Sequence, residues 1–464
     1  MFVGRQNELK QLDELYCSDK FECVIVHGRL RVGKTAFLHE FVKDKRSLYF
    51  AAQETSSREN LQNLANCVEA FSREPIAHTP EISSYTEAFD RIFWLSCSER
   101  LVLIIDDYEF LTVSHRGISE LIRGHIDQWF IDSKLMLIIC GSSEPVMEKE
   151  TLSYGSPFQE RRTAQILLHP FTFFETKRYY SDFSPFDIVV IYGVTGGVPR
   201  YLELMDPKIP IERNIQQTFF DTSSFLFEEP SNILRREVRE PGYYSAVLKS
   251  IATGCTKASD IATMVGLDSS ACTTHLKNLI AMRFVGKHTP LTEKAGEKTI
   301  YEIEDNMFRF WFRFVPHNIS LIKSEIAEKI WRDVARDISV YMGKVFEDIC
   351  RQWVELRNSA DRLPVKFTEI GRWWGVDPSQ GVDSSQDVDI TIPIVAHLDD
   401  SHALFGDCVW SDEPANADIL ASLNDKSQLF RHTNKYLFLF SRSGFSEECA
   451  ALAEQLGANL VMFE

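Results

Sequence analysis

The segment Gly28-Arg-Leu-Arg-Val-Gly33-Lys34-Thr35 is the most informative stretch of this chain. It matches the pattern G-x-x-x-x-G-K-S/T, in which a glycine-rich turn directs backbone N–H groups around an anion. The apolar run 22–27 before it predicts a buried strand. The amphipathic stretch 34–42 after it predicts a helix whose positive end adds to anion binding. We therefore expect a phosphate-binding loop, formed by Gly28, Arg29, Leu30, Arg31, Val32, Gly33, Lys34, Thr35 and Ala36.

Two further apolar runs, 101–105 (LVLII) and 135–140 (LMLIIC), are continuous rather than alternating. Continuous apolar strands are typical of a sheet that is covered on both faces. A short strand is predicted at 47–50 (SLYF), and amphipathic helical stretches at 57–71 and 118–129 lie among the apolar runs. Strand–helix alternation of this kind predicts an α/β domain with a mainly parallel sheet.

Acidic residues follow the second apolar run directly. Asp106 is expected to bind the shell of a magnesium ion together with the Thr35 hydroxyl, while Lys34 reaches the β- and γ-phosphates. Asp107 is expected to orient the attacking water, and Glu109 is the alternative base. A polar exit from strand to loop is the competing interpretation of this pair of aspartates.

Small polar residues end the third apolar run, at 140–143 (CGSS). Ser142 could contact the γ-phosphate or the attacking water. Arg161 and Arg162 follow further along the chain, and an arginine near the γ-phosphate stabilises transition-state charge from the same or a neighbouring subunit. A solvated surface position for either arginine is the alternative.

Composition limits the class of protein. The chain has 464 residues, 44% hydrophobic and 25% charged, which is an ordinary globular balance and excludes a disordered or collagen-like chain. The net charge of −17 argues against a general nucleic-acid coat, although a local basic face is compatible with it. Ten scattered cysteines without a C-x-x-C pair favour a reducing compartment. With no secretory or membrane-spanning pattern in the sequence, we expect a cytoplasmic protein.

Five motifs in a fixed order carry a family resemblance: FVGR at 2–5, the loop 28–35, IIDDYEFL at 104–111, CGSS at 140–143 and GGVPRYLE at 196–203. The chain resembles the archaeal-type ATPases, which are related to AAA+ and STAND NTPases. The resemblance implies that Val3, Gly4 and Arg5 lie near adenine, and that Pro199 closes over the base. The chain departs from the pattern of this family in two respects. Most hydrolysing relatives have glutamate at the position of Asp107, and the segment 156–160 separates the arginines from the usual tyrosine-glycine pair.

The expected fold is an α/β P-loop NTPase with an ASCE-type parallel sheet, a helical lid, a winged helix-turn-helix and a C-terminal α/β restriction-endonuclease-like domain. The boundaries are 1–165 for the ATPase core, 166–235 for the lid, 236–316 for the winged helix and 317–464 for the C-terminal domain. We read 319–340 as a helical connector and 343–353 as a separate helix.

Three short helical stretches and a hairpin, at 243–304, have the order of a winged helix-turn-helix. The third helix buries Cys272, Leu276, Leu279 and Ile280, and its outer face carries Thr273, Thr274, His275, Lys277 and Asn278. The hairpin carries Lys287, His288, Lys294 and Lys298, and its lysines could contact phosphates. Duplex DNA is one expected partner, and a packing module that couples nucleotide state to the C-terminal domain is the alternative.

The C-terminal domain carries acids in a nuclease-like pattern. Asp387 and Asp389 share one face of a predicted strand, Asp407 follows on the next strand, and Glu347 precedes them on a helix. Val409 occupies the position of the usual lysine, and only Lys366 could replace it. We therefore expect an inactive, degenerate nuclease-like domain, with ordinary surface acids as the alternative. The segment 372–374 (RWW) is either a binding surface or a buried corner.

The leading hypothesis is an ATP-binding protein with slow Mg²⁺-dependent hydrolysis, in which nucleotide state rearranges the domains. A DNA-binding regulator that uses ATP only as a switch, and a metal-dependent nuclease, are the alternatives. An oligomer or a protein partner is compatible with the sequence, whereas a membrane is not an expected partner.

Overall fold

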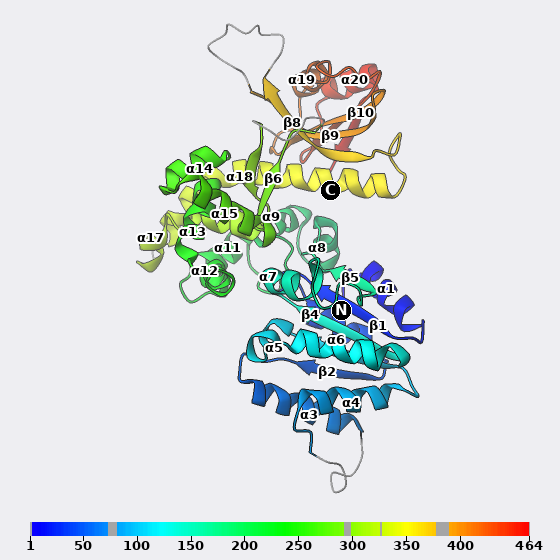
Figure 1. Cartoon of the computed structure of the whole chain (residues 1–464). Helices are drawn as coiled ribbons and strands as arrows, with labels where there is room; N and C mark the ends of the chain where they lie inside the picture. Colours follow the sequence, from blue (N-terminus) through cyan, green and yellow to red (C-terminus); the bar gives the residue numbers. More distant parts are fainter. Residues whose placement is uncertain (1, 73–80, 292–297, 325–326, 377–388, 464) are drawn as a thin grey trace. The chain divides into compact units, whose positions relative to one another are not determined.

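The computed structural model describes residues 2–72, 81–291, 298–324, 327–376 and 389–463. The chain forms two compact units. Unit 1 comprises Met1–Phe171 and Val198–Arg200, and unit 2 comprises Thr172–Gly197 and Tyr201–Glu464. Each unit is described by itself below, with helices and strands labelled as in Figure 1.

Unit 1 is built on a parallel sheet with the strand order β2-β3-β4-β1-β5. The strands are β1 (Glu22–His27), β2 (Ser47–Ala51), β3 (Leu101–Asp106), β4 (Leu135–Gly141) and β5 (Ala164–Leu167). Every residue of β1, β3 and β4 is buried, as expected for continuous apolar strands covered on both faces. This is the parallel-sheet P-loop NTPase fold that the sequence predicts.

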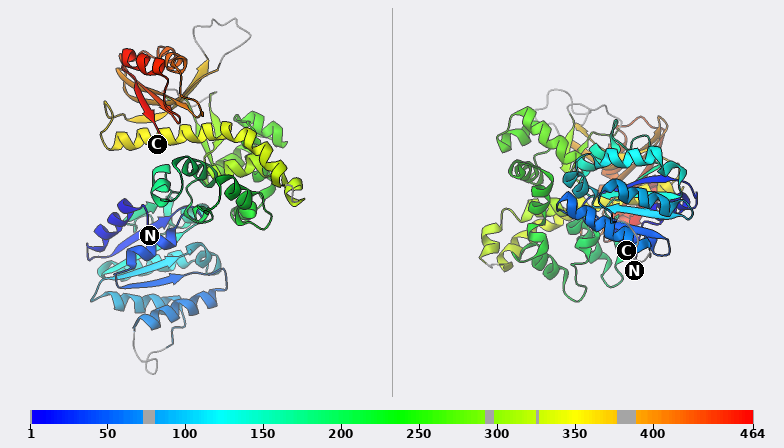
Figure 2. Two further views of the ribbon diagram at one scale, coloured as in Figure 1. Left: turned by 180° about the vertical axis from the view of Figure 1, so that it is seen from behind. Right: turned by 60° about the horizontal axis from the view of Figure 1, so that its bottom comes forward.

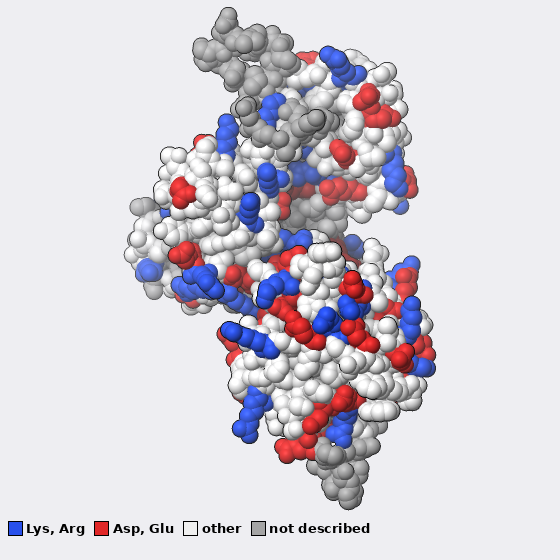
Figure 3. All heavy atoms as spheres, viewed as in Figure 1, with Lys and Arg blue, Asp and Glu red and all other residues white. Residues whose placement is uncertain are grey.

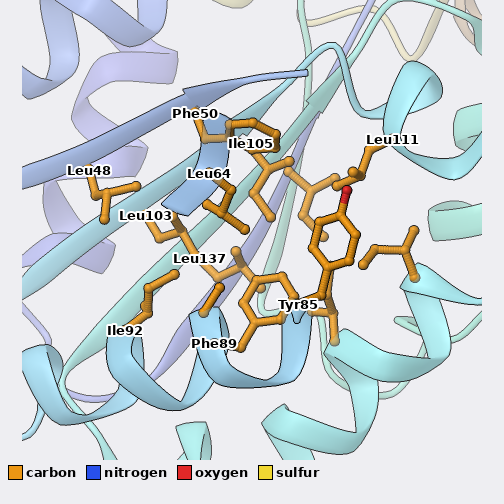
Figure 4. Packing of buried hydrophobic residues seen from close by; sticks show 14 of the residues in the cluster. Leu48, Phe50, Leu64, Tyr85, Phe89, Ile92, Leu103, Ile105, Leu111 and Leu137 are labelled. Carbon is orange, nitrogen blue, oxygen red and sulfur yellow. The ribbon is translucent and has the colours of Figure 1, made fainter. Parts of the chain in front are cut away.

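Helices cover both faces of this sheet. One face packs against α1 (Gln6–Tyr16) and α2 (Lys34–Val42). The other packs against α3 (Ser57–Ser72), α4 (Tyr85–Ser96), α5 (Tyr108–Ser114) and α6 (Ile118–Gln128). Figure 4 shows this second core, where Phe89 and Ile92 of α4 meet Leu103 and Leu137 of the strands. The short elements η2 (Phe130–Asp132), α7 (Glu144–Met147) and η3 (Glu148–Leu152) complete the unit.

Unit 2 begins with helices and a hairpin. The helices are α8 (Phe173–Tyr179), α9 (Pro185–Thr195), α10 (Pro199–Leu202), α11 (Ile211–Phe219), α12 (Phe225–Glu237), α13 (Pro241–Ala252), α14 (Ala258–Val265) and α15 (Ser269–Ala281). Strands β6 (Val285–His288) and β7 (Ile300–Ile303) then pair antiparallel, and α16 (Asn306–Phe314) and α17 (Ile319–Lys323) follow. Helix α10 crosses the boundary, because its first two residues belong to unit 1 and its last two to unit 2.

One prediction for this region is wrong. The expected connector 319–340 and helix 343–353 are largely one helix, α18 (Ala327–Ser359), which the left view of Figure 2 shows as a continuous yellow helix. A glycine inside a helix weakens it by about 1 kcal/mol without ending it, so Gly343 gave a false boundary. Tyr341 donates a hydrogen bond to Gly193 O (2.6 Å), and Phe346 packs in the core of the following sheet. These contacts on both sides of Gly343 hold α18 together.

The C-terminal part of unit 2 is a second sheet, of strand order β12-β11-β10-β9-β8. Its elements are β8 (Glu369–Val376), β9 (Asp389–Asp399), β10 (His402–Val409), α19 (Ala417–Ser427), β11 (Asn434–Ser441), α20 (Glu447–Leu456) and β12 (Asn459–Met462). Strands β8 to β10 are antiparallel, and β10 to β12 are parallel.

Strand β8 was not predicted, although it contains the segment 372–374. Its side chains alternate: Trp373 is buried in the sheet core, while Arg372 and Trp374 lie against the β6–β7 hairpin. Neither interpretation, a binding surface or a buried corner, describes the whole segment. The period of two in a strand places its three adjacent residues in two environments.

Acidic and basic side chains are interspersed over the face drawn in Figure 3. Among the described residues, no helix is both long enough and apolar enough to cross a membrane.

Candidate nucleotide-binding site

The loop between β1 and α2 has the backbone of an anion cradle. Gly28 and Gly33 have φ of 151° and 89°, which favour glycine. A Cβ at Gly28 would lie only 2.3 Å from Leu168 O, so no other residue fits there. Gly33 is the N-cap of α2 and has no side chain to occupy the first N–H groups of that helix. These donors are available to an anion.

Lys34 lies inside this loop and is only 6% exposed. Its Nζ donates to Gly28 O (2.8 Å) and Arg29 O (2.9 Å). Burial lowers the pKa of Lys34 from its ordinary value, and Cys140 and the carboxylates of Glu109, Asp106 and Asp107 oppose that shift. One ammonium therefore lies within electrostatic reach of three carboxylates, and a divalent cation would balance the net negative charge of these four groups.

Asp106, at the end of β3 and 2% exposed, is brought together with Thr35 as the sequence predicts. Thr35 Oγ1 donates to Asp106 Oδ2 at 2.9 Å, and the Asp107 N–H donates to Asp106 Oδ1 at 2.9 Å. Tyr49 of β2 also donates its hydroxyl hydrogen to Oδ2. Burial, and then the charge of Asp106, raise the pKa of Tyr49, so the phenol is a protonated donor.

These groups fit a magnesium ion. Mg²⁺ prefers oxygen ligands and commonly takes one or two from the protein, the rest being phosphate oxygens and water. The hydroxyl of Thr35 and the carboxylate of Asp106 provide such oxygens, and they are already adjacent before any ion is considered. Thr35 is exposed at the start of α2, so an ion could reach it.

The acids after β3 differ in their environments. Asp107 is partly exposed at the N-cap of α5 with φ of 52°, a left-handed conformation that aspartate tolerates better than most residues. Glu109 is 4% exposed, and both of its carboxylate oxygens accept the Ser142 N–H, each at 3.2 Å. Glu109 therefore holds the end of β4, which weakens the case for it as the alternative base. Ser142 itself lies 7% exposed at that end.

The residues expected near adenine also lie beside the loop. Arg5 is buried, donates to Val32 O (3.5 Å) and to His169 O, and stands 5.3 Å from the Phe171 ring centroid. A Cβ at Gly33 would lie 3.8 Å from Pro199 Cγ. Val3 and Gly4 precede Arg5 directly. The structure thus collects the N-terminal segment, the loop and Pro199 in one place.

The structure does not bring Arg161 and Arg162 to this site. They precede β5, which runs parallel to β1. The two arginines therefore lie at the amino ends of the strands, whereas the loop lies at the carboxyl ends. Arg161 pairs with Asp127 of α6 at 2.8 Å, and Arg162 donates to Thr151 O (2.8 Å) and Leu152 O (2.7 Å). The expectation of either arginine at the γ-phosphate of its own chain is therefore not met.

Sequence reasoning missed two polar neighbours of the site. Tyr49 lies in the strand predicted at 47–50, and no signal in the sequence identified its hydroxyl as a neighbour of Asp106, because that proximity depends on the pairing of β2 with β3. His27, the last residue of β1, contacts Glu144 Oε2 through Nδ1 (3.2 Å) and Gln165 through Nε2 (3.0 Å). The position of His27 directly before the phosphate-binding loop was the sequence signal that could have identified it as a neighbour of the site.

Comparison with known proteins identifies the family to which the chain is similar. Residues 2–205 match a family described as an ATPase domain predominantly from Archaea, and residues 311–421 match one described as archaeal and bacterial proteins of unknown function. An uncharacterized protein of Methanocaldococcus jannaschii is 30% identical over 413 residues, 89% of this chain and 88% of that protein. An uncharacterized ATP-binding protein of the same organism is 39% identical over 46 residues, 10% of this chain and 78% of that protein.

Among solved structures, a Walker-type ATPase of Pyrococcus abyssi is similar in fold, with a TM-score of 0.53 and 20% identity. The similarity covers 67% of this chain and 96% of that one.

Proposed function

Because this chain belongs to the family of archaeal-type ATPases, we propose that it binds ATP with Mg²⁺ and hydrolyses it slowly to ADP and phosphate. The observation that carries the proposal is the meeting of three groups at the end of β1 and β3. Lys34 is inside the loop, and the Thr35 hydroxyl contacts the Asp106 carboxylate. A triphosphate and a divalent ion are the ligands that use all three groups.

The proposed chemistry is the in-line attack of water on the γ-phosphorus, which forms a new P–O bond and breaks the bond from the γ-phosphorus to the β–γ bridging oxygen, so that ADP leaves. Lys34 neutralises phosphate charge, Asp107 positions the water and accepts its proton, and Ser142 contacts the γ-phosphate. A magnesium ion held by Thr35 and Asp106 would further neutralise the phosphate oxygens. Hydrolysis is slow because the Asp107 side chain is one methylene shorter than glutamate.

Recognition of the base is assigned to the group beside the loop. The backbone at Val3, Gly4 and Arg5 lies next to adenine, and the Pro199 ring packs on the base, supported by its position near Gly33. The loop residues 28–36 bind the phosphates through their backbone N–H groups.

Calorimetry with ATP and Mg²⁺ tests the proposal. Wild-type protein should release or absorb heat with saturation at one site, and Lys34→Ala should lose binding. Lys45→Ala is the matched control, since this lysine pairs with Asp13 instead. ATP affinity in Lys34→Ala equal to that of the wild type would reject the loop as the site.

Nucleotide state is proposed to change the arrangement of the two units. Helix α10 supports this, because Pro199 and Arg200 belong to unit 1 while the next two residues belong to unit 2. A base that packs on Pro199 would therefore bear directly on the junction. Small-angle scattering with ATP, with ADP and without nucleotide measures the change. Identical curves in all three states would reject coupling.

A second candidate is duplex DNA binding by α13–α15 and the hairpin as a winged helix. The favourable observation is that Thr273, Thr274, Lys277 and Asn278 of α15 are exposed while Cys272, Leu276 and Leu279 are buried. The hairpin, however, is held on β8, and Lys294 lies outside the described residues. An electrophoretic shift at low and moderate salt, with and without ATP, tests this candidate.

The C-terminal sheet remains a candidate for a degenerate nuclease-like domain. Glu347 pairs with Lys344 at 2.9 Å, and Asp407 lies 3.8 Å from Lys426 of α19. Asp387 lies outside the described residues, and Lys366 pairs with Asp361 (2.9 Å). Within the described part of the chain, no group of three or more His, Cys, Asp or Glu residues could hold a metal ion. Incubation of plasmid DNA with the protein and Mg²⁺ or Mn²⁺ tests this hypothesis. Cleavage by the wild type that is lost in Asp389→Ala would contradict the hypothesis that the domain is inactive.

Arg161 and Arg162 stay candidates for a role toward the site of a neighbouring subunit. This role requires an oligomer, so light scattering with and without ATP tests it. A protein that stays monomeric with ATP would exclude this role.

A further inference from the structure

Tyr49 contacts the proposed magnesium site from strand β2, which holds neither of the proposed ligands, Thr35 and Asp106. It lies on the edge strand β2, where it pairs in register with Ile104 of β3, and Ala51 pairs with Asp106. Its side chain packs on the face covered by α1 and α2. From there its hydroxyl reaches Asp106 Oδ2, the oxygen that also accepts from Thr35.

The ring of Tyr49 is fixed independently of this hydrogen bond. It stacks on His39 of α2 with ring centroids 4.6 Å apart and planes 9° from parallel. A stacked ring loses little additional conformational freedom when its hydroxyl forms a hydrogen bond. The phenol is therefore a preorganised donor, aimed at a carboxylate on the neighbouring strand.

The donors to Asp106 differ in what they can do when an ion is present, and they include the buried Cys140 thiol as well as Thr35, Tyr49 and the Asp107 N–H. The Asp107 N–H belongs to the backbone and fixes Oδ1. Thr35 is itself a proposed ligand, so its oxygen has to face the ion. Tyr49 is not a proposed ligand, so its hydroxyl can donate to this carboxylate whether or not an ion is bound. Outer-shell donors of this kind orient the ligands that a metal ion uses.

We propose that Tyr49 is a positioning residue that holds Asp106 in the orientation required for magnesium, and so sets the Mg²⁺ requirement of nucleotide binding. This inference rests on the proposed function of the same site. It assigns to Tyr49 no contact with the nucleotide, and it predicts no role for the hydroxyl when magnesium is absent.

The substitution Tyr49→Phe isolates the hydroxyl, because the phenylalanine ring can keep the stack on His39. Tyr85→Phe is the matched control. The Tyr85 hydroxyl donates to Ser57 O (3.0 Å) in the core on the other face of the same sheet, remote from Asp106. Both variants lose one partly buried phenol oxygen in unit 1, and only one of them changes the environment of Asp106.

The experiment is calorimetric titration of ATP in EDTA and over a series of Mg²⁺ concentrations. We expect equal ATP affinities in EDTA for wild type, Tyr49→Phe and Tyr85→Phe. The Mg²⁺ concentration that gives half of the Mg²⁺-dependent gain in affinity should rise about tenfold in Tyr49→Phe alone. A purely structural role would instead weaken binding equally with and without magnesium, and that result would overturn the proposal.

Two other outcomes are distinguishable. If wild-type protein binds no ATP under any condition, the proposed function fails. If it binds ATP and Tyr49→Phe has the wild-type Mg²⁺ curve, only the role of Tyr49 is rejected. Should Tyr49→Phe not fold, His39→Ala at an exposed position removes the stack. A higher Mg²⁺ requirement in that variant supports the proposal, and an unchanged requirement rejects it.

Discussion

Glu109 of α5 accepts the backbone N–H of Ser142 with both carboxylate oxygens, each 3.2 Å from the nitrogen. The helix that follows β3 is thereby tied to the end of β4. A Cβ at the neighbouring Gly141 would lie 2.8 Å from Glu109 Oε2 and 2.3 Å from Met147 Sδ, so a larger residue there would displace these two side chains. The two strand ends that carry Asp106 and Ser142 are thus held in one arrangement.

Glu109→Ala should destabilise the protein by about 1–3 kcal/mol, because it leaves a buried N–H group without its acceptor. Glu109→Gln should lose less, since the amide oxygen can still accept. Urea denaturation measures both, with Glu14→Ala as an exposed control. Equal stability of Glu109→Ala and the control would show that this contact contributes nothing.

Asp107→Glu should raise the rate of ATP hydrolysis by about tenfold, a small part of what a well-placed general base contributes. The reason is reach, because the added methylene brings the carboxylate closer to the attacking water. Single-turnover phosphate release measures the rate. Asp107→Asn, which keeps the shape and removes the base, is the control and should be slower than wild type. A glutamate variant no faster than wild type would dissociate this position from water activation.

Asp348 makes the stability of unit 2 dependent on acid pH. Burial alone would raise its pKa, but Arg309, Arg351 and Lys344 outweigh burial and hold the pKa at about 2. Arg309 Nη1 lies 3.1 Å and Arg351 Nη1 3.2 Å from its carboxylate oxygens. In an unfolded chain the value is about 3.9. The contribution of Asp348 to the free energy of unfolding is therefore complete above about pH 4 and is lost as the pH falls toward 2, with a size of about 2–3 kcal/mol.

Asp348→Asn should be less stable than wild type at pH 5, and the difference should shrink between pH 4 and pH 2. Thermal unfolding across this range measures it. Asp412→Asn, at an exposed partner of Arg442, should differ from wild type by little at any pH. A difference between wild type and Asp348→Asn that is constant with pH would contradict the assignment.

The β6–β7 hairpin should loosen when its contact with β8 is removed. Arg372 forms a two-bond ion pair with Glu302 of β7, and Trp374 Nε1 donates to Lys298 O at 3.0 Å. Arg372→Ala should raise the rate of tryptic cleavage after Lys287 and Lys298 about tenfold, as expected when a charge-assisted contact of about 1.5 kcal/mol is lost. Mass spectrometry of timed digests follows both sites.

Arg357→Ala is the matched control for this digest. The guanidinium of Arg357 lies 4.9 Å from the Trp353 ring centroid on α18, away from the hairpin contact between Arg372 and Glu302. Wild-type cleavage rates in Arg372→Ala would show that other contacts hold the hairpin.

Much of unit 1 could be predicted from the sequence, because its strands are continuous apolar runs and its loop has a fixed spacing. The proximity of Thr35 to Asp106 followed from the parallel sheet, since the carboxyl ends of parallel strands meet at one edge. The same rule explains the failure for Arg161. Residues directly before a parallel strand lie at the opposite edge, and no strand was predicted at Ala164–Leu167, directly after the two arginines.

Other features depend on contacts that no local pattern encodes. Tyr49 became a neighbour of Asp106 only through the pairing of β2 with β3. The four residues 47–50 do not reveal which strand lies beside them. Strand β8 was missed because its Trp373 and Trp374 face different environments. Each of these cases required knowledge of which elements pack together.

Helix α18 has a consequence for how unit 2 can be divided. At 33 residues it is about 50 Å long, and its Tyr341 and Phe346 contact helix α9 and the C-terminal sheet respectively. A fragment that starts at residue 317 would keep the helix but uncover the apolar stripe that α9 protects, and would tend to aggregate. Protein made for separate study of the C-terminal sheet should therefore begin near residue 172, where the whole stripe remains shielded from water.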